Sequence, residues 1–269
     1  QGGRTARRFG YKMMIGYIPD PFGHPGQVPQ ILRGFGIEYA ALWRGVDDQP
    51  CELWWQAPDG SRVLLAHLRD SYSNGANLAA HEPAQFTAQL AQARDSLLAH
   101  SAASDVLVMF GTDHMEPPAH TSAAIAYAGA HLPGTRVVHS CLPAYFDALK
   151  HQLAPDSLPT VKGELRACSR SPLLPGVLST RMWIKQRNHA CETLLEQWVE
   201  PFSTFASLLV GDLPRSERLS DPGPVARQAW RLLMENHPHD SICGCSIDQV
   251  HDEMKPRFDQ VDQIGEELA

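Results

Sequence analysis

Up to about residue 160, short apolar runs alternate with segments of helical periodicity, and this alternation limits the fold more than any other feature. Residues 12–18 form an apolar run that ends in a proline-rich loop, as expected of a buried strand. Residues 27–35 have the pattern of a short helix closed by glycine, and residues 39–43 form the next apolar run. A strand, a helix and a second strand in this order predict parallel pairing in an α/β domain.

The next residues continue this pattern and add a hairpin. Two apolar runs at 52–56 and 62–68 flank Pro58-Asp59-Gly60, and an Asp-Gly pair in this position predicts a β-hairpin. Apolar residues spaced three and four apart predict a helix over 82–100. The other elements predicted in this part are strands at 105–110 and 136–139 and helices at 122–131 and 143–152.

Beyond about residue 162 the periodicity is helical. A long helix is predicted over 179–209, with a bend at Pro201, because proline lacks the backbone donor and clashes with the preceding turn. A second helix is predicted over 225–236. Ser246 and Gln249 form a capping box, which predicts the start of a third helix. Three amphipathic helices with short connections predict a bundle.

Two domains are therefore expected, an α/β domain at 1–172 and a helical domain at 173–269. The chain has 269 residues, 43% of them hydrophobic, which is enough to bury a core in each domain. Residues 213–224 are rich in proline, serine, aspartate and glycine and are predicted to connect two helices.

The charge and the cysteines exclude some classes of function. The 23 basic and 30 acidic residues give a net charge of -7, which argues against a general binder of nucleic acid or of anionic membranes. No apolar run reaches the length of about 18 residues that a membrane span requires. Six scattered cysteines in a chain of this size favour reduced thiols and a cytoplasmic location, although secretion stays possible.

Two aspartates follow predicted strands directly. Asp20 lies between Pro19 and Pro21, which restrict the loop, and the carboxyl ends of strands are where α/β sheets place their sites. This position suits a nucleophile or a metal ligand, and the simpler alternative is a turn-forming aspartate. Asp113 follows the run at 105–110, and a pair of carboxylates is what glycoside hydrolysis requires.

Aromatic residues near these aspartates could contact a sugar ring. Aromatic side chains offer flat apolar faces, although core packing is their more common role. The candidates are Trp43, Trp54, Trp55 and Tyr72.

A second group of chemically active residues lies between two predicted helices. His237, His239 and Asp240 combine imidazole and carboxylate groups, which suit a divalent cation such as Zn²⁺. Two ligands do not make a site, and an ordinary surface loop is the alternative. Cys243 and Cys245 are separated by one residue, which is too close for the usual zinc spacing, so packing roles are expected for them.

Three segments carry a resemblance to a known family. Residues 17–32, with the sequence Tyr-Ile-Pro-Asp-Pro-Phe-Gly-His-Pro-Gly-Gln-Val-Pro-Gln-Ile-Leu, strongly resemble glycoside hydrolase family 38, the class II α-mannosidases. Residues 239–248 resemble the second metal-binding segment of that family in its bacterial form. Residues 178–185 resemble the start of its middle domain. The resemblance therefore extends over nearly the whole chain.

The resemblance implies a role for each matching residue. Asp20 corresponds to the nucleophile, which also binds zinc, and His239 corresponds to a histidine ligand of the zinc. Asp113 corresponds to the general acid/base, although Gly-Thr-Asp stands here where some members have two acids in a row. The residues that correspond to sugar contacts are Arg44, Tyr72, Asp240 and Arg181.

The resemblance also implies a fold and an activity. The fold is a partial (β/α) barrel-like catalytic domain with parallel strands, followed by a three-helix bundle. The activity is exo-acting, retaining hydrolysis of α-mannosides or mannose-containing oligosaccharides with Zn²⁺, and the full-length protein could be a homo-oligomer. The family takes two more zinc ligands from a His-x-Asp upstream of the nucleophile, which residues 1–11 do not contain, and it has a large C-terminal β domain. We therefore expect a fragment of a longer protein, or a remnant that cannot hold zinc tightly.

Two other functions stay open at this point. An acid and a histidine on a metal also activate water in metal-dependent deacetylases and amidohydrolases, which would not require Asp113. A non-catalytic fragment could bind carbohydrate weakly or pair with a separate N-terminal polypeptide. A His-x-Asp in the gene upstream of Gln1 would favour the hydrolase.

Overall fold

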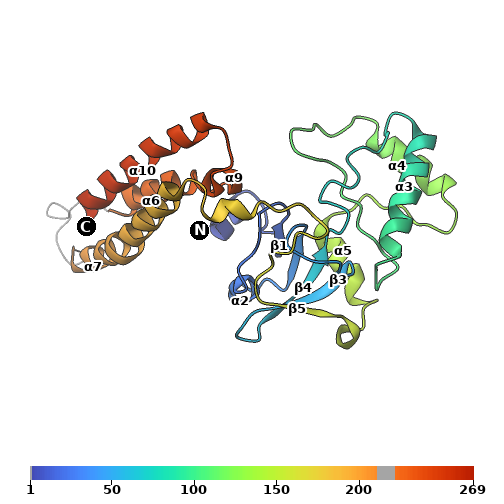
Figure 1. The fold of residues 1–269 in the computed structure, drawn as a ribbon, viewed down its shortest axis with the longest axis horizontal. Helices are drawn as coiled ribbons and strands as arrows, with labels where there is room; N and C mark the ends of the chain where they lie inside the picture. Colours follow the sequence, from blue (N-terminus) through green and yellow to red (C-terminus); the bar gives the residue numbers. More distant parts are fainter. Residues whose placement is uncertain (1, 211–221) are drawn as a thin grey trace. The chain divides into compact units, whose positions relative to one another are not determined.

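The computed structural model describes residues 2–210 and 222–269. The chain divides into two compact units, Gln1–Leu173 and Leu174–Ala269, and each is described by itself (Figure 1). All six cysteines lie in the described residues and are free thiols, in agreement with the prediction. Among the helices in these ranges, none combines the length and the apolar character that crossing a membrane requires.

The described part of the first unit is built on a five-stranded sheet with the strand order β1-β2-β4-β3-β5. Strands β1, β2 and β4 are parallel, β3 pairs antiparallel with β4, and β5 pairs parallel with β3. The carboxyl ends of the parallel strands β1, β2 and β4 therefore meet at one edge of the sheet. The strands are β1 (Ile15–Ile18), β2 (Tyr39–Leu42), β3 (Glu52–Gln56), β4 (Arg62–His67) and β5 (Thr160–Lys162).

Helices cover both faces of this sheet (Figure 1). Along β2, Ala40 and Leu42 belong to the cluster that packs against α2, whereas Ala41 belongs to the cluster that packs against α5. This alternation follows from the two-residue period of a strand. Helices α3 and α4 pack against each other in a hydrophobic cluster that is separate from the two clusters on the sheet. The helices are α1 (Gly2–Arg8), α2 (Val28–Gly34), α3 (Pro83–Leu98), α4 (Thr121–His131), α5 (Leu142–Lys150) and the 3₁₀ turn η1 (Pro155–Ser157).

The sequence predicted most of these elements, but two predicted strands are wrong. The β-α-β pattern at the start, the hairpin at Asp59-Gly60 and the helices α3, α4 and α5 are confirmed. Residues 105–110 and 136–139 are not strands. The backbone N–H of Met109 donates to the Asn74 side chain at 2.7 Å, and Gly75 N–H donates to Met109 at 2.8 Å. The first of these segments therefore bonds to a loop and not to the sheet.

The second unit is helical. Its core contains buried side chains from α6, η3, α8 and α10, among them Ile184, Leu195, Leu233 and Phe258. The elements are the 3₁₀ turn η2 (Pro175–Leu178), α6 (Met182–Thr193), the π-helical turn η3 (Leu194–Val199), α7 (Glu200–Val210), α8 (Gly223–Met234), α9 (His239–Cys243) and α10 (Asp248–Leu268).

Three details of this unit differ from the sequence analysis or refine it. The π-helical turn η3 ends at Val199, two residues before Pro201, and includes the carbonyl four residues before that proline, where proline would clash in a regular α-helix. The capping box at Ser246 is wrong, because α10 begins after Ile247 without a side-chain cap. Of the predicted connection at 213–224, residues 213–221 lie outside the described residues, and Gly223 already belongs to α8.

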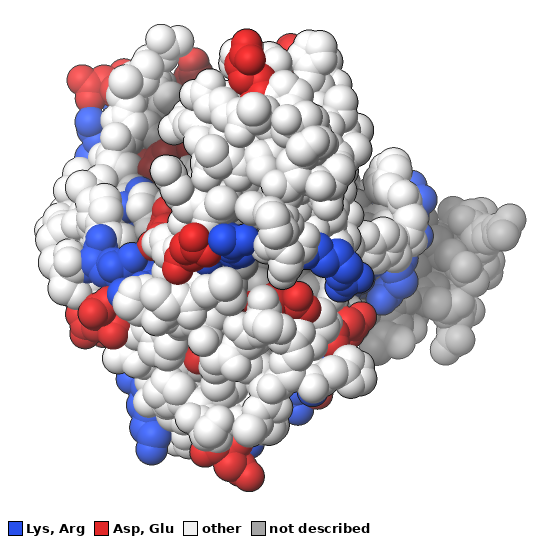
Figure 2. Space-filling model, turned by 90° about the vertical axis from the view of Figure 1, so that its right-hand side faces the viewer, with Lys and Arg blue, Asp and Glu red and all other residues white. Residues whose placement is uncertain are grey.

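Charged residues of both signs share the surface seen in Figure 2. In this view Lys and Arg side chains lie beside Asp and Glu side chains, with wide uncharged areas between them. Ion pairs of the first unit include Arg33–Glu38 and Arg94–Asp95. Exposed pairs of this kind contribute little to stability, about 0–1 kcal/mol each.

Candidate active site

Three of the predicted site residues follow the parallel strands at the same edge of the sheet. Asp20 comes two residues after β1, and Arg44 comes two residues after β2. Tyr72 lies in the loop that leaves β4. The carboxyl ends of parallel strands are where open α/β sheets bind their ligands. The topology therefore brings these three side chains, which lie up to 52 positions apart in the sequence, to the same edge of the sheet.

Asp20 and Arg44 form an ion pair. The Nε–H of Arg44 donates to Oδ1 of Asp20 at 2.6 Å, and the two side chains are 13% and 19% exposed. The guanidinium carbon lies 4.0 Å from the ring centroid of Trp43 and 5.3 Å from that of Phe22, so it makes cation–π contacts with two aromatic residues. A further hydrogen bond joins the guanidinium to the backbone oxygen of Pro172. These contacts hold one carboxylate oxygen of Asp20 in a defined position.

Tyr72 and Asp113 form the second pair. The phenol of Tyr72 donates a hydrogen bond of 2.8 Å to Oδ2 of Asp113. Burial, that hydrogen bond and the negative charges of Asp20 and Asp113 raise the pKa of Tyr72 to about 12. The phenol is therefore neutral near pH 7 and can donate its proton to the carboxylate.

Trp43 connects the two pairs. Its ring contacts the guanidinium of Arg44 and lies edge-on to Tyr72, with the ring centroids 5.4 Å apart. The structure thus brings Asp20, Arg44, Tyr72 and Asp113 into one continuous set of contacts. Of the aromatic candidates, Trp43 and Tyr72 belong to this set.

Tyr17 is a member of this site that the sequence analysis missed. It lies on β1, three residues before Asp20, and burial together with the charge of Asp113 raises its pKa. Two sequence signals could have found it: a polar hydroxyl near the end of an otherwise apolar strand, and its place as the first residue of the segment 17–32 that resembles the family. Trp55, in contrast, is fully buried in the core, and Trp54 lines a different cavity.

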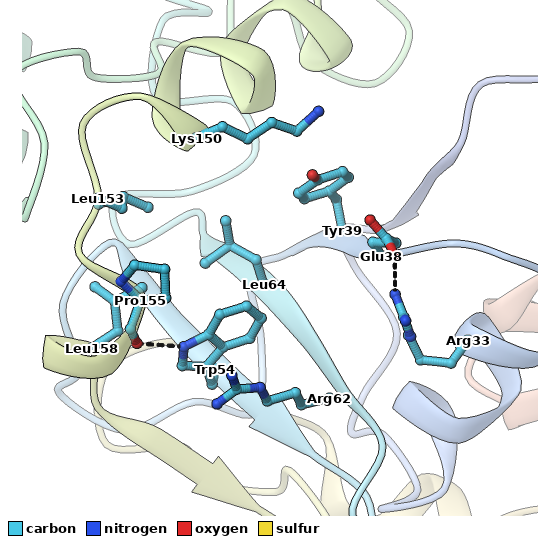
Figure 3. A pocket seen from close by; sticks show the side chains of 10 residues that line it. All are labelled: Arg33, Glu38, Tyr39, Trp54, Arg62, Leu64, Lys150, Leu153, Pro155 and Leu158. Carbon is cyan, nitrogen blue, oxygen red and sulfur yellow. Dashed lines mark hydrogen bonds and ion pairs between the residues drawn. The ribbon is translucent and has the colours of Figure 1, made fainter.

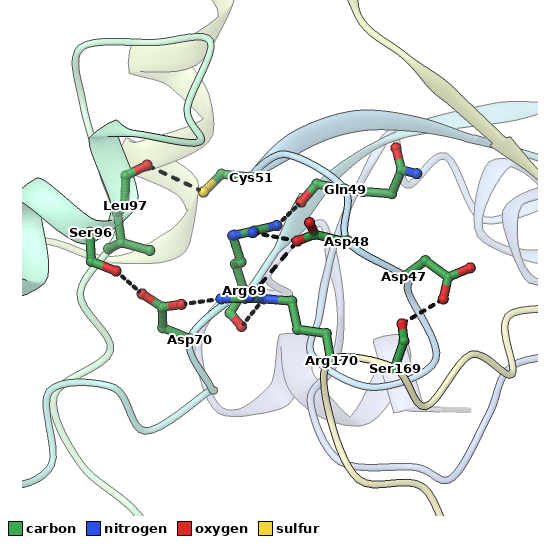
Figure 4. A network of polar contacts seen from close by, with 10 residues as sticks. All are labelled: Asp47, Asp48, Gln49, Cys51, Arg69, Asp70, Ser96, Leu97, Ser169 and Arg170. Atoms are coloured by element: carbon green, nitrogen blue, oxygen red, sulfur yellow. Dashed lines mark hydrogen bonds and ion pairs between the residues drawn. The ribbon is translucent and has the colours of Figure 1, made fainter.

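A network of polar contacts fixes the loop between β4 and Tyr72 (Figure 4). The buried guanidinium of Arg69 binds the Asp48 carboxylate and donates to the backbone oxygen of Gln49 at 2.5 Å. Arg170 donates to the Asp70 carboxylate at 2.7 Å and to the backbone oxygen of Arg69 at 3.2 Å. Charge-assisted hydrogen bonds of this kind are stronger than neutral ones. The network therefore joins the segments that follow β2 and β4 to residues near 170.

Two buried histidines also lie at this edge. His24 and His67 are 3% and 4% exposed, and burial lowers the pKa of each to about 4. Backbone hydrogen bonds oppose this shift only in part, from Arg44 for His24 and from Pro50 and Gln49 for His67. Both imidazoles are therefore neutral at pH 7.

These two histidines predict a loss of stability in mild acid. Their pKa is about 4 in the folded state and about 6.5 when unfolded, so the unfolded chain binds more protons between these values. The stabilisation is complete above about pH 6.5 and decreases as the pH falls toward 4. We expect the free energy of unfolding to drop by on the order of 2 kcal/mol per histidine between pH 7.5 and pH 5.

Urea unfolding at both pH values would measure this drop. The His67→Asn variant, which has no titrating group at this position, should show a smaller pH dependence than the wild type. An identical dependence in the two proteins would contradict the assignment.

His239 and Asp240 begin α9 in the second unit. His239 Nε2 lies 3.5 Å from Oδ1 of Asp240, and the thiol of Cys245 donates to the same oxygen at 3.2 Å. Burial and the contact with Asp240 raise the pKa of Cys245 to about 11, so this thiol keeps its proton. Gly244 ends the helix with φ +79°, which glycine adopts without strain.

Arg181 makes contacts within the second unit. Its Nε–H donates to the backbone oxygen of Gly244 at 3.1 Å, and its guanidinium pairs with Asp248 at 2.6 Å. Arg181 therefore supports the segment that follows α9.

The described residues do not complete a zinc site. Within 2–210 and 222–269, no three His, Cys, Asp or Glu residues are grouped so that they could hold a metal ion. Asp20 belongs to the first unit, where Arg44 binds one of its oxygens, and His239 belongs to the second unit. Structural and catalytic zinc sites use at least three protein ligands. The described residues of each unit therefore lack a three-residue donor set for zinc.

The first unit also contains a cavity of about 290 Å³ at the opposite edge of the sheet (Figure 3). Tyr39 and Arg62 are the first residues of β2 and β4, which places this cavity at the amino ends of the strands. Arg62 stacks on Trp54 at 4.2 Å, and Lys150 lies 5.1 Å from the centre of the Tyr39 ring. Of the candidate site residues, Trp54 lines this cavity, whereas Asp20, Arg44, Tyr72 and Asp113 do not. The lining residues are Arg33, Glu38, Tyr39, Trp54, Arg62, Leu64, Lys150, Leu153, Pro155 and Leu158.

Comparisons with known proteins relate both units to the same kind of enzyme, because each unit matches a family description. Residues 3–164 match the family described as Glycosyl hydrolases family 38 N-terminal domain, and residues 173–269 match the Alpha mannosidase middle domain. The crystal structure of an alpha-mannosidase from Enterococcus faecalis V583 is similar, with a TM-score of 0.86 and 32% identity over all of this chain and 30% of that one.

Two relatives in sequence are similar over nearly the whole chain. A protein of Halalkalibacterium halodurans, whose name assigns it provisionally as a mannosylglycerate hydrolase, is 38% identical over 97% of this chain and 30% of its own length. Alpha-mannosidase 2C1 of Homo sapiens is 30% identical over 97% of this chain and 24% of its own length. The chain thus spans less than a third of these relatives. Because the first family description alone matches more than half of its residues, the chain belongs to glycosyl hydrolase family 38.

Proposed function

We propose that the complete protein containing this chain is an exo-acting α-mannosidase that retains the configuration of the sugar. Asp20 acts as the nucleophile and Asp113 as the acid/base. The observation that supports this most directly is the set of contacts at the sheet edge, in which Arg44 binds Asp20, Tyr72 binds Asp113, and Trp43 touches both partners. Family membership supports the same chemistry.

In the proposed reaction each residue has a distinct task. Arg44 orients the carboxylate of Asp20, which attacks the anomeric carbon while Asp113 protonates the departing oxygen. The sugar is then bonded to Asp20, and water attacks its anomeric carbon while Asp113 takes the proton of the water. The bond to Asp20 breaks, which releases the sugar and restores the carboxylate. Tyr72 keeps the Asp113 side chain in place through both steps by its hydrogen bond. Retention requires the two carboxyl groups to lie about 5–5.5 Å apart when substrate is bound.

Substrate and metal contacts are part of the same proposal. Arg44, Tyr72, Asp240 and Arg181 contact the sugar, and Asp20 and His239 are two of the Zn²⁺ ligands in the complete protein. Zinc, when bound, would polarise sugar hydroxyl groups. The proposal takes the further ligands from outside the described residues, among which no group of three possible ligands is found. In that protein the sheet would form part of a (β/α) barrel-like domain, and the second unit a three-helix bundle.

The decisive experiment measures hydrolysis by the complete protein. Nitrophenyl α-mannoside, its β-anomer, other nitrophenyl glycosides and mannosylglycerate would be tested with added Zn²⁺ and with a chelator. We expect hydrolysis of α-mannosides that chelation abolishes. Mannosylglycerate is included because a 38% identical relative carries that name. No hydrolysis of any glycoside would contradict the proposal and would favour a carbohydrate-binding role.

The Asp113→Ala variant separates this function from the amidohydrolase alternative. Loss of the acid should slow the hydrolysis of methyl α-mannoside, a poor leaving group, far more than that of dinitrophenyl α-mannoside, because the dinitrophenolate leaves without protonation. A metal-dependent amidohydrolase would not depend on this carboxylate. Equal rates for the variant and the wild type on both substrates would remove Asp113 from the mechanism.

A further inference from the structure

The loop that leaves β4 supports Asp113 through a side chain and through its backbone. The phenol of Tyr72 binds the Asp113 carboxylate at 2.8 Å. The main chain before Asp113 bonds to the same loop, since Met109 N–H donates to the Asn74 side chain at 2.7 Å and Gly75 N–H donates to Met109 at 2.8 Å. A Cβ at Gly75 would lie 2.9 Å from the Met109 oxygen, so the two segments approach closely. The position of the candidate acid/base therefore depends on where this loop lies.

The backbone of the loop, residues 69–75, is strained at the residue before Tyr72. Ser71 has φ +103°, which residues other than glycine rarely adopt, and such a conformation persists only where surrounding contacts hold it. Local bonds supply part of that support. Ser71 N–H donates to the Leu68 oxygen at 2.9 Å, and the Ser71 hydroxyl oxygen accepts from the Ser73 N–H at 3.1 Å. Contacts at the start of the loop therefore help to decide where Tyr72 lies.

Arg170 makes the contacts at the start of the loop. Its guanidinium donates to the Asp70 carboxylate at 2.7 Å and to the backbone oxygen of Arg69 at 3.2 Å (Figure 4). These are the two residues immediately before Ser71. The other carboxylate oxygen of Asp70 accepts from the Ser96 hydroxyl at 2.8 Å, which joins the loop to α3. Because hydrogen bonds between charged partners are stronger than neutral ones, Arg170 is the main support of the strained backbone from outside the loop.

The segment that carries Arg170 is itself fixed to the region after β2. The Ser169 hydroxyl donates to the Asp47 carboxylate at 2.7 Å. The backbone oxygen of Pro172 accepts a hydrogen bond from the guanidinium of Arg44. Residues on both sides of Arg170 are therefore bound, and its side chain reaches the loop after β4 from a fixed base.

We propose that Arg170 is a positioning residue for the acid/base, which holds the loop after β4 so that the Tyr72 phenol meets the Asp113 carboxylate in one geometry. This rests on the proposed function insofar as Asp113 is the acid/base. Arg170 contacts neither the sugar nor the reacting atoms in this scheme. Without its bonds the loop can relax at Ser71, and a displacement of about 1 Å at a reacting group can lower the rate by about 100-fold.

The matched control is Arg33 in α2. Arg33 pairs with Glu38 at 2.6 Å, and Arg170 pairs with Asp70 at 2.7 Å. The two arginine side chains are 40% and 30% exposed, respectively. Arg33, however, lines the cavity at the opposite edge of the sheet. Replacement of either arginine with methionine therefore removes a comparable side chain and ion pair, whereas only loss of Arg170 releases the loop after β4.

The kinetic test measures kcat/KM of Arg170→Met, Arg170→Lys and Arg33→Met in the complete protein with two substrates. The leaving oxygen of methyl α-mannoside requires protonation, whereas dinitrophenolate leaves without it. We expect Arg170→Met to lower kcat/KM by about 10- to 100-fold for methyl α-mannoside and by less than about threefold for dinitrophenyl α-mannoside, because the acid is displaced. Arg170→Lys keeps a cation near Asp70 and should recover a large part of this loss. Arg33→Met should leave both values within about threefold of the wild type.

A merely structural role of Arg170 predicts a different pattern. General loosening of the unit would lower kcat/KM for both substrates alike. Such equal losses in Arg170→Met, the same losses in Arg33→Met, or no recovery in Arg170→Lys would overturn the proposal. If Arg170→Met does not fold, Asp70→Ala breaks the same pair from the loop side. We expect it to discriminate between the two substrates in the same way, and equal losses for both would count equally against the proposal.

Hydrogen exchange of the complete protein provides a test that does not depend on activity. Mass spectrometry of peptides that contain residues 69–75 should show faster amide exchange in Arg170→Met than in the wild type, because the loop has lost its outside support. Arg33→Met should exchange there as the wild type does. Unchanged exchange of the loop in Arg170→Met would contradict the positioning role. If the wild type hydrolyses no glycoside, the proposed function fails, while the exchange rates still decide whether Arg170 holds the loop.

Discussion

Replacing Asp20 with alanine in the complete protein is expected to lower kcat for nitrophenyl α-mannoside by on the order of 10⁴-fold or more. The carboxylate is the proposed attacking group, and no neighbouring acid is held by Arg44 in the same way among the described residues. Without it the covalent step has no nucleophile. Steady-state kinetics with the aryl mannoside would measure the loss, and circular dichroism would verify that the variant is folded.

Two controls distinguish the loss of a nucleophile from a general disturbance. Asp156→Ala removes the same group from an exposed 3₁₀ turn and should leave kcat unchanged. Added azide, a small anion that can attack in place of the carboxylate, should restore part of the rate of Asp20→Ala. A variant that retains more than a tenth of the wild-type kcat would exclude Asp20 as the nucleophile.

The second large effect is on stability, and it concerns Trp55. Replacing this residue with alanine is expected to destabilise the first unit by about 3–5 kcal/mol. The indole is fully buried between strands and α2, its Nε1–H donates to the Gly163 oxygen at 3.0 Å, and its ring supports His24. The variant loses the buried apolar surface, leaves a cavity and frees a backbone carbonyl.

Urea unfolding followed by far-UV circular dichroism would measure this change. Trp198→Ala is the matched control, because it deletes the same side chain at a position that is 51% exposed. We expect that control to change the free energy of unfolding by about 1 kcal/mol or less. If both variants lose the same stability, burial at position 55 is not what stabilises the unit.

The candidate site was only partly predictable. The sequence placed Asp20, Arg44 and Tyr72 after strands, and parallel pairing then brings such positions to one edge. The hydrogen bond between Tyr72 and Asp113 joins residues 41 positions apart, and no local pattern specifies it. The roles of these residues, and those of His239, Asp240 and Arg181, stay predictions for the complete protein.

Two errors of the sequence analysis, the strand at 105–110 and the capping box at Ser246, also arise from contacts between distant parts of the chain. Residues 105–110 are apolar enough for a strand, but a strand also requires a neighbour, and Met109 bonds to the loop at Asn74 and Gly75. The capping box at Ser246 has the right residue types, yet α10 starts later, at Asp248. In both cases local composition allowed a structure that the surrounding chain did not select.

The sequence by itself determined the alternation of strands and helices in the first unit, the hairpin at Asp59-Gly60 and the helical character of the second unit. These features depend on residues a few positions apart, because side-chain period and turn conformation are local properties. Only the tertiary structure decided that Trp55 is core while Trp43 stacks on Arg44, and that His24 is buried and neutral. Burial and hydrogen-bond partners depend on which distant segments pack together, and that information is not contained in local spacing.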